Sequence, residues 1–476
     1  MGSPMIEAEV NLLQINRGTV TAPAGCGKTQ LIAKALASYQ GSKPILVLTH
    51  TNAGVAALRA RLDRAGVRSS AYRLSTIDGW AMRLISTFPA RSGHDPAVLN
   101  LKNASRDYPV IREAAWRLLQ AGHANDVIRS SYAQLIVDEY QDCSVPQHTI
   151  VYFLSHVLPT CVLGDPMQAI FGFPGNALAD WNQHVCAHFP VVHELQTPWR
   201  WNNAGEPVLG TWLLQARHAL MRGERVDLRL APPQVTWVPL AGADDHPKRL
   251  AAARTASPIA EGRVLIIGDS TNPESQRNIA SQTPGAVTVE AVDLRDLLAF
   301  GRSYDPASQS GLADLMAFAQ SVMTNLGVPA FLKRLESLAK GTARNPATKA
   351  ETAARDFQVS PSFDLATHLL MELRAQPDVR VHRPAILYSA LKAMRQAASG
   401  TMTFEAATQR VREDNRMQGR PLPKRAVGST LLLKGLEAEV AVIMNGDGLD
   451  ARNLYVAMSR GSMRLVVCSV KPVLGG

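Results

Sequence analysis

The chain has 476 residues, too many for one ordinary domain of about 150 residues, so about three domains are expected. Its hydrophobic fraction of 46% is that of a globular protein with large cores. The net charge is +10 and the pI is near 9.5, which favours a polyanionic partner, with nucleic acid as the first candidate. No apolar run reaches ~18 residues, so a membrane span is not predicted, and no signal-peptide pattern is present.

The five cysteines are scattered along the chain and form no C-x-x-C pair. This pattern indicates neither a zinc site nor a disulfide framework. A reducing, cytoplasmic compartment therefore fits best.

The first two hundred residues alternate short apolar strands with helices. The predicted elements are, in chain order, a strand at 18–21, a helix at 28–39, a strand at 44–49, a helix at 52–65, and strands at 134–137 and 161–163. Continuous apolar runs of this length, separated by helices, indicate a parallel sheet that is covered on both faces.

The same alternation returns later, with apolar strands at 263–267, 440–444 and 464–468. The predicted fold is α/β, with two parallel-sheet lobes, a short insertion in the first and a helical insertion in the second. The expected domains are a first lobe of 1–87 and 132–196, a small insertion of 88–131, a second lobe of 197–291 and 426–476, and a helical insertion of 292–425.

Residues 22–29 read A-P-A-G-C-G-K-T, between a predicted strand and a predicted helix. Glycines in such a loop let backbone N–H groups close around phosphates, while Lys28 contacts the β- and γ-phosphates and the Thr29 hydroxyl ligates Mg²⁺. A turn without chemical importance is the alternative, which the G-K-T ending disfavours. The predicted nucleotide-binding residues are Ala22, Pro23, Ala24, Gly25, Cys26, Gly27, Lys28, Thr29 and Gln30.

Residues 135–142 read L-I-V-D-E-Y-Q-D, a buried strand that ends in two adjacent carboxylates. Ligands bind at the carboxyl ends of strands in α/β sheets. Asp138 is therefore predicted to hold the Mg²⁺ together with Thr29, and Glu139 to orient or deprotonate the attacking water. These residues predict a nucleoside triphosphate and Mg²⁺ as cofactors.

An ordered series of motifs resembles the superfamily 1A (UvrD/Rep-like) nucleic-acid helicases. The resemblance extends over both predicted lobes and implies that both are RecA-like. After the phosphate loop the series reads T-N-A-G-V-A-A-L (51–58), S-T-I-D-G-W (75–80), V-D-E-Y-Q-D (137–142), G-D-P-M-Q-A-I-F-G-F (164–173), T-P-W-R-W (197–201), K-G-L-E (434–437) and N-L-Y-V-A-M-S-R-G (453–461). The compact size and reduced insertions also resemble the helicase-like subunit of Gabija-type phage-defence systems, which works beside a nuclease.

The resemblance implies roles for residues around the triphosphate. Gln168 senses the γ-phosphate, and Arg200 and Arg460 reach it from the second lobe as arginine fingers. A surface salt bridge is the alternative for each arginine. Trp199 stacks on the base, and Gly435 and Glu437 belong to the motif that binds the ribose.

For the nucleic acid, the resemblance implies that Thr51, Asn52 and Thr76 contact the phosphodiester backbone and that Phe173 stacks on a base. Such contacts suit a single strand because they tolerate any base sequence. Core packing is the alternative role for Phe173.

Several positions depart from the family pattern. Pro174 follows Phe173 where the family has Arg, Asp78 replaces a His, Ala53 replaces a Lys, and the His expected before K-G-L-E is absent from T-L-L-L (430–433). These changes bear on unwinding and force coupling more than on ATP hydrolysis.

Two hypotheses about function follow. The first is an ATP-driven translocase or helicase on single-stranded DNA, with 3′→5′ polarity implied by the family. The second is a regulatory or sensor subunit that binds ATP and DNA, unwinds little, and controls a partner such as a nuclease. A small-molecule P-loop kinase is a third reading that the motif series disfavours. The pathway, whether repair, conjugation or phage defence, stays open, as does the choice of DNA over RNA.

Overall fold

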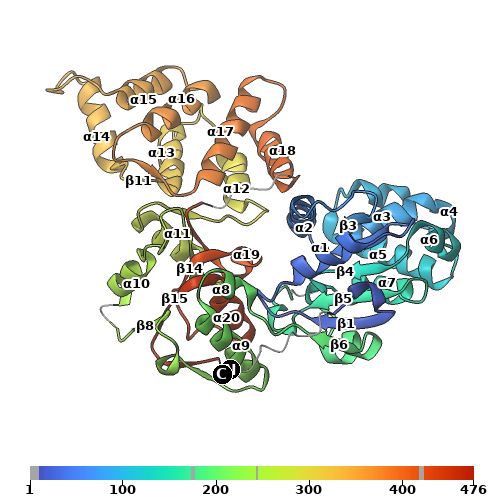
Figure 1. Ribbon diagram of the computed structural model, residues 1–476. Coiled ribbons are helices and arrows are strands. Elements are labelled where there is room, and N and C mark those ends of the chain that lie inside the picture. Colours follow the sequence, from blue (N-terminus) through green and yellow to red (C-terminus); the bar gives the residue numbers. More distant parts are fainter. Residues whose placement is uncertain (1–9, 173–176, 243–244, 418–422, 476) are drawn as a thin grey trace. The chain divides into compact units, whose positions relative to one another are not determined.

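The structure is a computed structural model that describes residues 10–172, 177–242, 245–417 and 423–475 (Figure 1). Contacts between residues divide the chain into two compact units. The first unit comprises Met1–Asp227, Leu449–Ser459 and Val473–Gly476, and the second comprises Leu228–Gly448 and Arg460–Pro472.

The first unit is built on a six-stranded parallel sheet with the order β3-β2-β4-β5-β1-β6. Its strands are β1 (Arg17–Thr21), β2 (Ile45–Thr49), β3 (Tyr72–Thr76), β4 (Leu135–Val137), β5 (Thr160–Gly164) and β6 (Val191–Glu194). The central strands carry only buried residues, as expected for a parallel sheet that is covered on both faces.

Two hydrophobic cores flank this sheet because successive side chains of a strand point to opposite faces. On β2, Ile45 and Val47 pack with α1 and α2, whereas Leu46 and Leu48 pack with α3, α5 and α7. The helices of this part are α1 (Lys28–Ser38), α2 (Asn52–Arg64), α3 (Ile77–Thr87), α4 (Pro89–Ser92), α5 (Ala104–Gln120), α6 (Asn125–Ser131) and α7 (Val145–Leu154), with short helical turns η1 (Leu12–Gln14), η2 (Pro96–Asn100), η3 (Tyr140–Asp142), η4 (Pro166–Gln168) and η5 (Trp181–Cys186).

Three later helices also pack within the first unit. They are α8 (Trp199–Asn203), α9 (Pro207–Met221) and α20 (Ala451–Met458), and the short strands β7 (Val226–Asp227) and β16 (Val473–Leu474) pair with each other in the same unit. The sequence prediction assigned 197–291 and 426–476 to the second lobe, whereas α8, α9 and α20 fall in the first unit.

The second unit contains a further six-stranded parallel sheet with the order β10-β13-β9-β14-β15-β8. Its strands are β8 (Val235–Pro239), β9 (Val264–Gly268), β10 (Ala286–Thr288), β13 (Arg425–Ser429), β14 (Ala438–Ile443) and β15 (Gly461–Ser469), flanked by η6 (Leu228–Leu230), α10 (Asp245–Ala253), α11 (Pro273–Gln282) and α19 (Thr430–Leu433). Two parallel α/β sheets confirm the predicted fold class of two RecA-like lobes.

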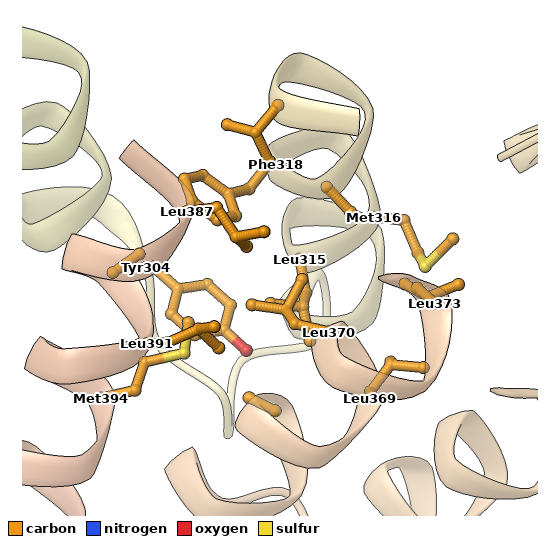
Figure 2. Close-up of a cluster of buried hydrophobic side chains, with 14 of the residues drawn as sticks. Tyr304, Leu315, Met316, Phe318, Leu369, Leu370, Leu373, Leu387, Leu391 and Met394 are labelled. Carbon is orange, nitrogen blue, oxygen red and sulfur yellow. The ribbon is translucent and has the colours of Figure 1, made fainter. Parts of the chain in front are cut away.

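A helical region lies between β10 and β13 and has a core of its own. Its elements are α12 (Arg295–Ser303), α13 (Gly311–Val322), β11 (Met323–Thr324), α14 (Val328–Ala339), α15 (Lys349–Val359), α16 (Phe363–Arg374), β12 (Arg380–Val381), α17 (Pro384–Ala398) and α18 (Phe404–Met417). Figure 2 shows Leu315 from α13, Leu370 from α16 and Leu387 from α17 converging with Tyr304 in this core. Burial of so many apolar side chains stabilises the region.

Across the described part of the chain, every helix is too short or too polar to cross a membrane.

Candidate nucleotide-binding site

The phosphate loop joins β1 to α1 and depends on two left-handed glycines. Gly25 has φ 71° and Gly27 has φ 86°, a backbone region that residues with a side chain rarely adopt. A Cβ atom at Gly25 would lie 2.6 Å from the ring of Trp201 and 2.8 Å from the Cβ of Arg200. The loop therefore requires glycine for its conformation and also for the close approach of α8.

Helix α8 lies directly against this loop. The Arg200 backbone N–H donates to the Gly25 carbonyl at 3.0 Å, and Trp201 is buried with 1% of its surface exposed. Trp199 lies beside Gly27, so that a Cβ there would be 3.0 Å from its ring, yet Trp199 remains 53% exposed. An indole held next to the phosphate loop with an open surface suits stacking on a nucleotide base.

Lys28 begins α1 and forms ion pairs with both carboxylates that follow β4. Its Nζ lies 2.9 Å from Asp138 Oδ1 and 2.6 Å from Glu139 Oε1. Burial lowers the pKa of the Lys28 ammonium, but the charges of Asp138 and Glu139 outweigh burial and raise it above its usual range. The ammonium is therefore charged at any physiological pH.

The two carboxylates differ in environment. Asp138 is buried, and burial raises its pKa against the opposing effect of Lys28, while its Oδ1 accepts from the Glu139 backbone N–H at 3.0 Å. The Glu139 side chain is 38% exposed, and its backbone has the left-handed φ of 54°. Such a conformation is strained for a residue other than glycine and is concentrated at functional sites.

Gln141 connects Glu139 to the next strand end. Its Nε2 donates to Glu139 Oε2 at 2.6 Å, and its Oε1 accepts from the Asp165 backbone N–H at 3.2 Å. Gln168 Nε2 donates to Asp165 Oδ2 at 3.1 Å. The predicted sensor Gln168 is thus linked to the predicted base Glu139 through Asp165 and Gln141.

Sequence reasoning did not assign roles to Gln141, Asp165 or the arginine that holds Asp165. Arg217 on α9 is fully buried, and its guanidinium lies 3.0 Å from Asp165 Oδ1 and 2.8 Å from Glu194 Oε1. Gln141 and Asp165 could have been found because they stand inside the D-E-Y-Q-D and G-D-P motifs. Arg217 stands in no motif, so no sequence signal marked it.

Helix α20 also contacts the phosphate loop, through a tyrosine that the sequence prediction missed. The Tyr455 hydroxyl accepts a hydrogen bond from the Ala24 backbone N–H at 3.0 Å. Burial raises the pKa of this hydroxyl well above its usual value, so Tyr455 stays neutral. The carbonyl of Ser459, after the same helix, accepts from the Arg200 guanidinium at 2.6 Å. The L-Y-V-A letters of the last motif were the available signal.

Oxygen ligands suited to Mg²⁺ are present at the loop. Thr29 stands in the first turn of α1, and the Asp138 carboxylate is held at the end of β4 by Lys28. One hydroxyl and one carboxylate, with phosphate oxygens, form the donor set that Mg²⁺ prefers. Among the described residues no group of three or more His, Cys, Asp or Glu could hold a metal by itself.

The remaining predicted nucleotide residues lie in the second unit. Arg460 is buried and donates from its guanidinium to the Leu436 carbonyl at 3.2 Å. Gly435 and Glu437 flank Leu436 and are exposed, with Gly435 at φ 81°. The structure therefore brings these three residues together within that unit.

The predicted nucleic-acid residues lie at the carboxyl ends of β2 and β3. The Thr51 hydroxyl accepts from the Gly54 N–H at the start of α2, and the Thr76 hydroxyl accepts from the Gly79 N–H at the start of α3. Asn52 is the exposed first residue of α2. Phe173 lies outside the described residues. Parallel pairing of Thr49 with Thr76 places both strand ends at one edge of the sheet.

Asp78, where the family pattern has His, is used inside the unit. Its carboxylate accepts two hydrogen bonds of 2.7 Å from the Arg112 guanidinium and one of 3.1 Å from Gln147 Nε2. A bidentate pair of this kind fixes α3 to α5. Asp78 therefore has a structural role at this position.

Comparison with known proteins gives a family match over the segment that contains this site. Residues 7–174 match a protein family described as an AAA domain, and the matched segment contains the phosphate loop and both carboxylates. A search of curated proteins found no match. Among solved structures, the chain is similar to arterivirus nonstructural protein 10, a helicase in complex with DNA, at 10% identity and a TM-score of 0.36 over 96% of this chain and 61% of that one. The chain thus spans about three fifths of that neighbour's length.

Proposed function

We propose that the protein is an ATP-driven translocase or helicase that moves on single-stranded DNA in the 3′→5′ direction. The observation that carries the proposal is the arrangement of Lys28, Asp138 and Glu139 at two strand ends beside a glycine-dependent loop. A lysine, a metal-binding carboxylate and a candidate base within ion-pair distance of one another are the parts that phosphoryl transfer requires.

Each residue has a distinct task in this proposal. The Lys28 ammonium neutralises charge on the β- and γ-phosphates, which compete with the two carboxylates for the same cation. Thr29 and Asp138 hold Mg²⁺, which when bound neutralises phosphate charge. Once the phosphates replace Glu139 as partners of Lys28, the Glu139 carboxylate leaves that ion pair and orients the attacking water or accepts its proton.

Further residues supply binding and charge stabilisation. Trp199 stacks on the base, and Arg200 acts on the γ-phosphate from its place beside the loop. The proposal retains the roles that the family resemblance gives to Arg460 on the γ-phosphate and to Gly435 and Glu437 on the ribose.

Coupling to the nucleic acid uses the link from Glu139 to Gln168. Because Glu139 bonds Gln141, Gln141 bonds Asp165 and Asp165 bonds Gln168, a change at the γ-phosphate alters the segment that follows β5. Thr51, Asn52 and Thr76 contact the strand backbone at the neighbouring strand ends, and Phe173 stacks on a base.

The test is ATP hydrolysis by wild type, Glu139→Gln and Glu113→Gln, each with and without single-stranded DNA. Glu113 is exposed on α5 in a surface pair with Arg117, so its substitution serves as the matched control. Loss of a general base lowers the rate by about 10²- to 10⁴-fold, so Glu139→Gln is expected to lose DNA-stimulated turnover while Glu113→Gln keeps it. If DNA does not change the wild-type rate, the motor proposal fails.

The second candidate is a regulatory subunit that hydrolyses ATP and binds DNA but unwinds little, working beside a nuclease in DNA repair or antiviral defence. The observation that favours it is the use of Asp78 in a partly buried contact with Arg112 and Gln147. A strand-displacement assay with 3′- and 5′-tailed duplexes distinguishes the two candidates. Unwinding from 3′ tails alone supports the helicase, and DNA-stimulated ATPase without displacement supports the regulator.

A further inference from the structure

A pocket of about 300 Å³ lies along the outer edge of the first sheet, away from the phosphate loop. Three arginines line it from three different elements: Arg59 from α2, Arg73 from β3 and Arg83 from α3. All three are exposed. The lining contains no Asp or Glu, so the positive charge is not compensated within the pocket.

The strand that borders this pocket is the last strand of its sheet. In the order β3-β2-β4-β5-β1-β6, β3 has a neighbour on one side only. The Ile45 N–H donates to the Ala71 carbonyl at 2.9 Å, which sets the alternation of the ladder between β2 and β3. The N–H and C=O groups of Tyr72 and Leu74 therefore point to the outer edge.

These outer-edge groups are the hydrogen-bonding groups of an unpaired strand. The Tyr72 carbonyl accepts from the Arg73 guanidinium at 3.0 Å, and the same guanidinium donates to the Ser69 carbonyl at 3.1 Å. These bonds hold one arginine along the edge. Exposed strand edges of this kind accept an added strand from another chain.

The pocket is poorly shaped for stacking on bases. Three aromatic side chains line it: Tyr72 and Trp80 are each only 4% exposed, with their rings in the sheet's cores, and Tyr132 is half-buried and packs against one of those cores. Sequence-independent binding of single strands uses exposed ring faces beside a basic groove. Strand-edge donors and acceptors flanked by arginines fit an extended peptide better than a nucleic acid.

We infer that this edge binds an extended acidic segment of a partner protein, which adds a strand to β3 and places carboxylates against Arg59, Arg73 and Arg83. Backbone hydrogen bonds to Tyr72 and Leu74 supply affinity that is independent of side chains, and the arginines select an acidic sequence. The surface is separate from the residues assigned to ATP hydrolysis.

The probe is a fluorescein-labelled heptapeptide that alternates Glu with Val. Its binding to the full chain is measured by fluorescence anisotropy. Two comparison peptides replace every Glu by Lys, or every second Val by Pro, which removes backbone donors. The test variant is Arg59→Glu with Arg83→Glu. The matched control is Arg64→Glu with Arg106→Glu, because both of these arginines are exposed in the same unit and lie outside the pocket lining.

The acidic peptide is expected to bind wild type and the control variant equally and to bind the Arg59/Arg83 variant at least about tenfold more weakly. The Lys and Pro peptides are expected to bind at least about tenfold more weakly to wild type. Hydrogen exchange of the segment 70–76 is expected to slow when the acidic peptide is present, and ATP hydrolysis is expected to be unchanged in both variants.

Three results would overturn the inference. Equal binding of the Pro peptide would show attraction of charge without strand addition. Equal peptide binding by the Arg59/Arg83 variant would place the site elsewhere. Weaker binding of single-stranded DNA by that variant, with no binding of the acidic peptide to wild type, would assign the pocket to nucleic acid.

Discussion

Two strand-to-helix loops at the carboxyl ends of the two sheets have opposite chemistry. The loop between β1 and α1 carries the Lys28 ammonium and two left-handed glycines. In the loop between β9 and α11, the Asp269 carboxylate instead accepts from the Thr271 N–H at 2.8 Å, and Asn272 caps the helix. The second loop thus satisfies its own donors and presents negative charge. The same architecture therefore acquires a phosphate site only where the loop residues provide one.

The largest effect is expected for Lys28→Ala. Removing the buried cation eliminates the partner of two carboxylates and of the phosphates, and we expect kcat/KM for ATP to fall about 10³-fold. Steady-state ATPase kinetics and binding of a fluorescent ATP analogue measure this. Lys34→Ala, an exposed position on the same helix, is the control. ATPase activity within tenfold of wild type would contradict the role of this loop.

Each unit contains a buried arginine, and the two arginines differ in how much their removal is expected to lower the free energy of unfolding. Arg217 pairs with fully buried Asp165 and with Glu194, which is 37% exposed, and Arg383 pairs with Glu290, which is 9% exposed, and with Asp296, which is 38% exposed. Removing the arginine leaves a buried carboxylate without its ion-pair partner. We therefore expect Arg217→Met to lower the free energy of unfolding by about 3 kcal/mol, and Arg383→Met to lower it by less. Urea denaturation measures both.

These two variants also separate stability from activity. Arg217→Met is expected to lower ATPase activity even where the protein is folded, because Asp165 orients Gln168. Arg383→Met is expected to leave activity in the folded protein intact. An equal loss of activity in both variants would argue against the link through Asp165.

A smaller effect concerns acid stability, to which each unit contributes one buried histidine. Burial lowers the pKa of His148 to about 4, helped by His188 and His184, and lowers the pKa of His382 to about 4, helped by Arg383. The unfolded chain, with an ordinary pKa near 6.5, binds a proton first.

The stability that these neutral histidines contribute is complete above pH ~6.5 and is lost as the pH falls towards ~4. We expect each site to account for about 1–2 kcal/mol of this loss. Unfolding free energies of His148→Gln and His382→Gln at several pH values measure it. A pH dependence identical to wild type in both variants would refute the assignment.

The smallest effect is expected for Asp269→Asn in the second unit's loop. This side chain stays within its own loop, and we expect ATP hydrolysis to change less than about twofold. A loss of ATPase activity comparable to that of Lys28→Ala would mean that both loops take part in phosphate binding and that their chemistry is not opposite.

Much of the fold could be read from local sequence. Apolar runs such as 45–48 favour buried strands because they are too short for a helix and lie between helical patterns, and the glycines beside Lys28 favour a phosphate loop. The lobe boundary was harder to place. Helices α8 and α9 pack with the first unit through long-range contacts that leave no periodic signal in the sequence.

The sequence by itself determined the α/β class, the loop around Lys28 and the carboxylates at the end of β4, since each depends on neighbouring residues alone. The tertiary structure decided which distant groups support them: Arg217 buried against Asp165, the Tyr455 hydroxyl on the Ala24 N–H, and Asp78 held by Arg112. These pairs join residues far apart in the chain. Their energies depend on burial and geometry that only the folded chain defines.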